Sequence, residues 1–143
     1  MEQEDYIKRQ IDQLGRVLGK ILAGLLGLKS QGSAGDVAAE LTFELEDVLP
    51  LNRGDLASMP DDLFLEMIND GRKFGEENLG KLAEILHLLG AEYSRPGLAG
   101  KKGKNFYEKA LRVYEYIDKT GKTYSFDRHL KIEAVKHALK EVT

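Results

Sequence analysis

The three histidines are the residues with the most versatile chemistry, because imidazole binds metals and transfers protons near neutral pH. They are His87, His129 and His137. The second and third are separated by eight positions, which places them about 80° apart around a helix. They therefore do not form the i, i+4 pair of a helical metal site. We expect surface histidines, no bound metal and no cofactor.

Four carboxylates lie on the expected outer face of the segment 36–49, namely Glu40, Glu44, Glu46 and Asp47. A di-iron site would combine such residues with Glu-x-x-His units on facing helices, and this segment holds no histidine. The spacing favours a solvated acidic face, paired with basic residues of the segment before it.

Nucleophilic catalysis is not indicated. The chain has no cysteine, which excludes thiolate nucleophiles, disulfides and Cys-based metal sites and fits a reducing compartment. Ser33, Ser58, Ser94 and Ser125 lie where loops or helix caps are expected, and no Gly-x-Ser-x-Gly turn occurs. The glycine-rich stretch 97–103 lacks the phosphate-loop spacing and follows no strand. We therefore predict a protein that is not an enzyme.

A basic cluster is the main signal for nucleic acid. It comprises Arg95, Lys101, Lys102, Lys104, Lys109 and Arg112, with Tyr107 as a neighbouring aromatic residue. However, the whole chain has a net charge of −3. Residues 1–72 carry 7 Lys/Arg and 14 Asp/Glu, whereas residues 73–143 carry 14 and 10. A bipolar charge of this kind orients partners or simply reflects solvated faces.

The elements that position these residues are expected to be helices. Apolar residues recur every three or four positions, and no stretch alternates with a period of two. The 143 residues suffice for one domain, made of an N-terminal helix pair in 1–50 and further helices in 60–143. The six expected helices are about 4–28, 36–49, 60–70, 76–94, 105–120 and 125–143.

The first helix is long and amphipathic, with an apolar stripe from Ile7 to Leu28. It contains Gly15, Gly19, Gly24 and Gly27, and each glycine costs about 1 kcal/mol in a helix interior. Close packing within the chain, self-association into a homodimer, or contact with a membrane surface would each account for them. The acidic N-terminus does not resemble a signal peptide, and the apolar run is too interrupted for a transmembrane segment.

The helix pair in 78–117 resembles a tetratricopeptide repeat (TPR). Leu89, Gly90 and Tyr93 match the first helix of that repeat, and Ala110 and Tyr114 match the second. Leu86 stands where tryptophan is typical, and the connection is about eight residues too long. The match covers about 40 residues of the chain. The resemblance implies an array of helical hairpins with a groove that binds peptides.

Glu84, His87, Ala91 and Arg95 would line the concave face of such a repeat. Chaperone-binding members of the family have lysine and asparagine where this chain has His87 and Ala91, so no carboxylate clamp is expected. The basic loop 95–104, with Lys101, Lys102 and Lys104, is the second candidate surface.

The whole chain also resembles an uncharacterised bacterial family of helical proteins. The resemblance lies in Asp5-Tyr6-Ile7-x-x-Gln10-Ile11, in Ala110-Leu111-x-x-Tyr114 and in Thr123-Tyr124-Ser125-Phe126. It implies a cytoplasmic protein with a TPR-like C-terminal half. We expect an interaction or scaffold protein that binds a protein or peptide partner, and regulatory nucleic-acid binding through the cluster around 95–112 is the alternative.

Overall fold

A computed structural model describes residues 2–31, 35–49, 55–69, 74–95, 101–121 and 124–142 of the chain. These residues form six α-helices and no strand, which confirms the predicted all-α fold. The helices are α1 (Glu2–Gln31), α2 (Gly35–Val48), α3 (Asp61–Asn69), α4 (Glu76–Tyr93), α5 (Lys102–Thr120) and α6 (Phe126–Val142).

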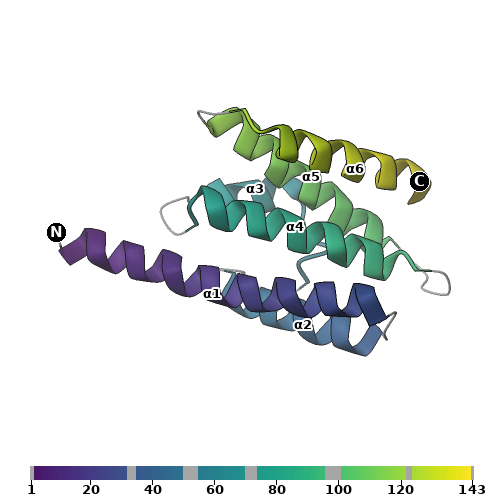
Figure 1. Ribbon diagram of the computed structural model, residues 1–143, viewed down its shortest axis with the longest axis horizontal. Helices are drawn as coiled ribbons and strands as arrows, with labels where there is room; N and C mark the ends of the chain where they lie inside the picture. The colour runs from purple at the N-terminus through teal and green to yellow at the C-terminus, as the bar shows by residue number, and fades with distance from the viewer. Residues whose placement is uncertain are drawn as a thin grey trace.

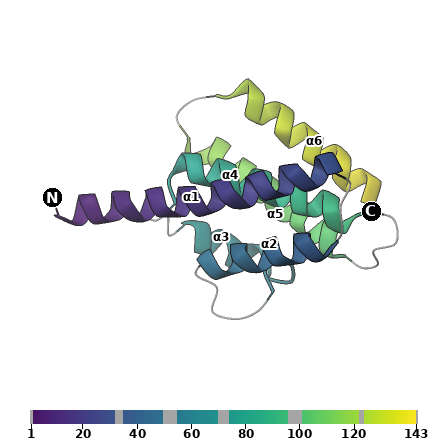
Figure 2. The ribbon, with the colours of Figure 1, turned by 60° about the horizontal axis from the view of Figure 1, so that its bottom comes forward.

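Helix α4 is central, because α1 packs along one flank, α5 runs antiparallel to it on another, and α6 covers α5 (Figure 1). Helix α2 packs against α1, and the short α3 packs against α5. The N-terminal part of α1 projects beyond the other helices in both ribbon views (Figures 1 and 2). In the described part of the chain, no helix is long and apolar enough to cross a membrane.

The tightest helix contact is the crossing of α4 and α5, where two glycines remove the side chains that would hold the helices apart. A Cβ atom on Gly90 would lie 2.6 Å from the ring of Tyr107. A Cβ atom on Gly103 would lie 2.9 Å from the carbonyl oxygen of Gly90 and would also collide with the Ser94 hydroxyl. Both distances are shorter than van der Waals contact, so the crossing requires glycine at both positions.

Two of the four α1 glycines serve packing within the chain. A Cβ atom on Gly15 would lie 2.9 Å from Oδ1 of Asn78, and one on Gly24 would lie 3.2 Å from Leu41 on α2. The buried Asn78 amide donates to the carbonyl oxygen of Ile11 at 2.9 Å and fixes α1 on α4. Gly19 and Gly27 have nothing within 4 Å of such an atom, so packing within the described chain does not explain them.

A buried lysine joins the turn before α3 to α5. Lys109 is only 2% exposed, and its ammonium group donates to the carbonyl oxygens of Met59 at 2.6 Å and Ala57 at 3.3 Å. Asp61 supplies the opposite charge at 3.4 Å. Burying an ammonium ion is costly unless it is paired and hydrogen-bonded, and these oxygens meet that requirement.

The predicted buried stripes are confirmed on α4 and α5 and partly wrong on the peripheral helices. Each peripheral helix buries a narrower stripe because it packs against fewer neighbours, and Ala38, Ile132 and Val135 provide the contacts instead. The spacing of apolar residues also predicts that six further side chains face inward, but the structure exposes Val37 (38%), Leu63 (54%), Phe126 (65%), Leu130 (53%), Ala134 and Val142 (36%).

The helix ends agree with the sequence at most places but not at α5. Ser125 caps α6 through a hydrogen bond from the Arg128 amide, and α3 begins directly after Pro60. Asn105, with Glu108 three residues later, has the sequence pattern of a helix N-cap and predicts that the fifth helix starts there. This prediction is wrong, because α5 begins at Lys102 and the Asn105 amide donates to the carbonyl oxygen of Lys101. The predicted cap Ser33, the terminating Gly71 and residues 96–100 lie outside the described residues.

The α4–α5 crossing generates a stability prediction with a matched control on the same helix. We expect Gly90→Ala to destabilise the protein by about 1–3 kcal/mol, because the added methyl group must displace the Tyr107 ring. Gly80→Ala has open space around the new methyl group and should stabilise by about 0.5–1 kcal/mol through helix propensity. Urea unfolding followed by circular dichroism measures both, and equal effects would contradict the packing described.

Candidate functional site

The outer face of α4 between α1 and α6 is the most coherent candidate surface. We call it the α4 surface and define it by Gly80, Glu84, His87, Leu88 and Ala91. All five are at least partly exposed, and they follow the three- and four-residue spacing that brings side chains to one face of a helix. A Cβ atom on Gly80 would meet nothing within 4 Å.

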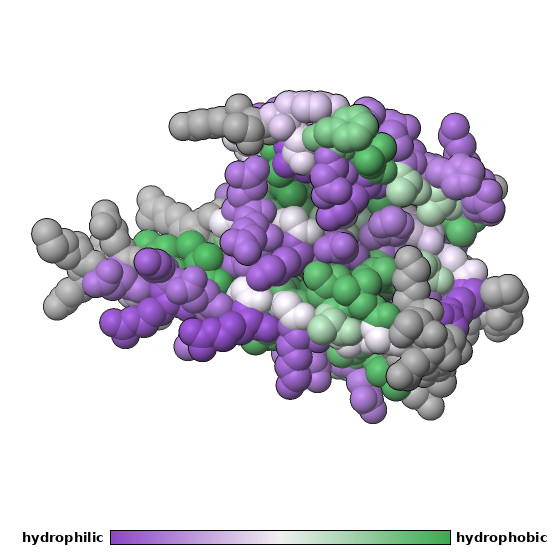
Figure 3. Space-filling model, viewed as in Figure 1, coloured by the Kyte–Doolittle hydropathy of each residue, from purple (hydrophilic) through white to green (hydrophobic). Residues whose placement is uncertain are grey.

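Helix α1 contributes an apolar edge to this surface. Gly15 faces α4, so Gly19, Leu22 and Leu26, which are 4, 7 and 11 positions further on, follow the same flank. Leu26 is 47% exposed and Leu22 is partly buried. Figure 3 shows hydrophobic side chains where α1 and α4 meet, with hydrophilic ones above them toward α6. Sequence reasoning did not identify this edge, because spacing along α1 does not reveal which neighbouring helix each of its flanks faces.

The opposite edge of the α4 surface is polar. The Glu84 carboxylate lies 3.9 Å from the ammonium group of Lys131 on α6, and the His87 ring packs against Tyr107 with 5.8 Å between centroids. Arg95 bonds to the buried carboxylate of Glu92 at 2.9 Å. The structure therefore places Glu84, His87 and Ala91 together and directs Arg95 toward its own helix.

The residues of the basic cluster do not form one continuous exposed surface. Lys109 is buried, Lys104 lies 4.0 Å from Glu108, and Arg112 lies 3.1 Å from Glu115. Lys102 lies over the ring of Tyr93 rather than beside Lys101. Tyr107 is only 5% exposed, so it is wrong to treat it as an aromatic residue available for stacking on a base. Lys102 and Lys104 belong to α5, so the predicted 95–104 loop is shorter than expected.

Two buried tyrosines lie behind the α4 surface. Burial raises the pKa of Tyr107, although a hydrogen bond with Ser94 opposes the shift. Burial also raises the pKa of Tyr114 well above 10, and the negative charges of Glu84 and Asp127 add to this effect. Within the described residues, the Tyr114 hydroxyl has no hydrogen-bond partner. Neither phenol is therefore disposed to release a proton near neutral pH.

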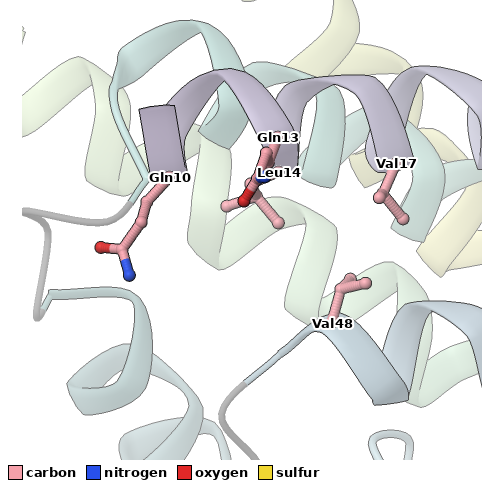
Figure 4. Close-up of a pocket in the computed structure, with 5 residues that line it drawn as sticks. All are labelled: Gln10, Gln13, Leu14, Val17 and Val48. Atoms are coloured by element: carbon pink, nitrogen blue, oxygen red, sulfur yellow. The ribbon is translucent and has the colours of Figure 1, made fainter. Parts of the chain in front are cut away.

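A hollow of about 330 Å³ separates parts of α1 and α2 and is lined by Gln10, Gln13, Leu14, Val17 and Val48 (Figure 4). Leu14 and Val17 of α1 and Val48 of α2 are aliphatic, and the two glutamines supply the polar groups. No ionisable side chain lines it among the described residues. This hollow has the composition of a helix-packing gap and offers no group for catalysis.

Metal binding finds no support in the described part of the chain, which contains no group of three His, Asp or Glu residues able to hold an ion. Glu84 and His87 do have the Glu-x-x-His spacing. However, the Glu84 carboxylate faces Lys131 and the His87 ring faces Tyr107, so their surroundings differ from those of a di-iron centre.

Comparison with known protein families, curated proteins and solved structures finds no match for this chain.

The unpaired Tyr114 hydroxyl generates a pH-dependent prediction. Because the folded-state pKa of Tyr114 is raised above the ordinary value of 10.0, this group leaves the stability unchanged below about pH 10 and lowers it as the pH rises toward the folded-state pKa. We expect Tyr114→Phe to be neutral or stabilising by about 1 kcal/mol at pH 7, since no hydrogen bond is lost. At pH 11 the variant should gain about 1.4 kcal/mol more over the wild type. Urea unfolding at both pH values checks this, and an advantage that does not grow with pH would contradict it.

Proposed function

We propose that this protein is a non-catalytic interaction or scaffold protein that binds an amphipathic helix of a partner protein on the α4 surface. The proposal rests on glycines that have no side chain packed over them and that share the surface with leucines. Among the described residues, Gly19 and Gly80 have free space above the backbone. Leu22 and Leu26 share a flank of α1 with Gly19, and Leu88 belongs to the α4 surface with Gly80. A helix that docks in a groove uses this combination, because small residues permit close approach and leucines supply apolar area.

The polar edge of the α4 surface would fix the orientation of the bound helix. Glu84 and Lys131 are about one-third exposed, at 35% and 38%, and their charged groups lie 3.9 Å apart. Lys131 also lies 3.3 Å from Asp127, so its contact with Glu84 is the weaker of the two and can be exchanged for a group on a partner. Exposed ion pairs of this kind contribute little to stability, so exchange for groups on a partner costs little. The orientation of the helix then depends on charges that flank its apolar stripe.

The TPR resemblance agrees with this assignment. In that family the first helix of a repeat lines the peptide groove, and the resemblance assigns this role to α4. We propose that α4 and α5 act as one TPR-like unit, that α6 opens an incomplete second unit, and that the protein works in the cytoplasm. Nucleic-acid binding is less well supported, because ion pairs, burial or ring contact engage most of the basic cluster.

The test uses capture from the native cell extract with variants matched for chemistry. Gly19→Leu places a large side chain on the α4 surface, whereas Gly27→Leu places the same side chain on another face of α1, where no described residue lies within 4 Å of the added Cβ atom. We expect Gly19→Leu and Leu88→Glu to lower recovery of the captured partner about tenfold, which corresponds to about 1.4 kcal/mol. Gly27→Leu should leave recovery unchanged.

The captured protein must then bind through a helix. Cross-linking from position 88 followed by mass spectrometry should identify one segment with apolar residues at helical spacing. Equal capture by all variants would refute the α4 surface as the binding site. If light scattering instead shows a mass near twice 16.0 kDa that Gly19→Leu reduces, the helix that docks belongs to a second copy of this chain.

A further inference from the structure

A second hollow lies on the other side of α4, where α2 meets the ends of the α4–α5 hairpin. Its volume is about 400 Å³, and we call it the Tyr93 pocket. Helix α2, the turn before α3, the end of α4 and the start of α5 all contribute to it. The lining residues are Ala39, Thr42, Phe43, Glu46, Asp55, Tyr93 and Lys102.

The walls of the Tyr93 pocket are aromatic. One face of the Tyr93 ring stacks on Phe106, with 5.5 Å between centroids and 26° between ring planes. The ammonium group of Lys102 lies 4.8 Å from the Tyr93 ring centroid. Phe43 also lines the pocket, and 67% of its surface is exposed, so its ring is accessible to a ligand. Aromatic faces carry partial negative charge and attract cations.

The polar groups of the pocket are almost all hydrogen-bond acceptors. The Thr42 hydroxyl donates to the carbonyl oxygen of Ala38 at 2.8 Å, so the Tyr93 hydroxyl must donate to Thr42 across their 3.2 Å contact. The Tyr93 oxygen therefore keeps its lone pairs for another donor. Glu46 and Asp55 add two carboxylates.

Neither carboxylate forms an ion pair within the described structure, although Lys102 lines the same pocket. Glu46 accepts the Leu56 amide at 2.7 Å, and Asp55 accepts the Ala57 amide at 3.1 Å. Each carboxylate has a second oxygen, and no ion pair of either group is found among the described residues. With Lys102 included, the three ionisable side chains carry a net charge of −1, which favours a cationic ligand.

We propose that the Tyr93 pocket binds a primary alkylammonium group, either of a small polyamine or of a lysine side chain on a partner. Lys102 acts as a tethered occupant that a ligand displaces. Its ammonium group already lies against an aromatic face, and its side chain is exposed, so it can move into solvent at little cost. This site is separate from the α4 surface, because Tyr93 faces α2 through its bond to Thr42.

The experiment is an NMR titration of the ¹⁵N-labelled full chain with putrescine and, separately, with Nα-acetyl-lysine methylamide. Nα-acetyl-norleucine methylamide has nearly the same shape without the ammonium group and is the control ligand. We expect saturable shifts at the amides of Ala39, Phe43 and Tyr93 with the two cations and none with the control. If putrescine binds more tightly, the ligand is a polyamine. If Nα-acetyl-lysine methylamide binds more tightly, the ligand is a lysine side chain of a partner.

Variants test the assignment of the residues. Glu46→Gln and Asp55→Asn keep an oxygen that accepts the backbone amide but remove the charge, and each should weaken binding about tenfold. Lys102→Met removes the tethered cation and should strengthen binding about two- to fivefold. Glu44→Gln on the solvent side of α2 is the matched control and should change nothing.

Three results would overturn the proposal. They are the absence of saturable shifts, equal binding of the norleucine control, and equal affinity in Glu46→Gln, Asp55→Asn and Glu44→Gln. Unfolding midpoints of the variants establish that each is folded. Phe43→Ala provides a further variant, because removing a side chain that is 67% exposed should lower affinity severalfold without loss of stability.

Discussion

The close approach of α4 and α5 is the constraint on which the remaining structure depends. The ring of Tyr107 lies on the backbone of Gly90, and Gly103 lies against the carbonyl oxygen of that same glycine. This contact fixes α5, whose outer side then packs against α6 and α3, while the free flank of α4 receives α1. Large side chains at either glycine would separate the hairpin and displace every helix that packs on it.

The hairpin was also the most predictable part of the molecule. Leu89, Gly90 and Ala110 carry a local pattern that is interpretable without knowledge of distant residues, and the structure buries all three. Helix boundaries set by local chemistry, such as Ser125 before α6, were predictable for the same reason. At α5 a plausible cap at Asn105 gave the wrong start, because packing of Gly103 against α4 extends the helix by one turn.

The surfaces were harder to predict, since they depend on which helices become neighbours. Nothing in the sequence of α1 indicates that the flank with Leu22 and Leu26 is the one next to α4, because this depends on the contact of Asn78 with Ile11. The role of Lys102 was likewise hidden. Its position in a run of lysines suggested an exposed charge, whereas the fold places its ammonium group over Tyr93. Residues with several alternative partners cannot be assigned from their spacing alone.

Because Lys109 on α5 is buried, its chemical reactivity can report local unfolding of this protein. Lys101, Lys102 and Lys104 reach solvent to different extents, whereas Lys109 is 2% exposed and has its protons directed at carbonyl and carboxylate oxygens. Amine-reactive reagents need a deprotonated, accessible nitrogen, so Lys109 reacts only when the turn before α3 detaches from α5. The rate at which Lys109 is modified therefore measures local unfolding, and the faster-reacting lysines Lys102 and Lys104 on the same helix serve as an internal reference.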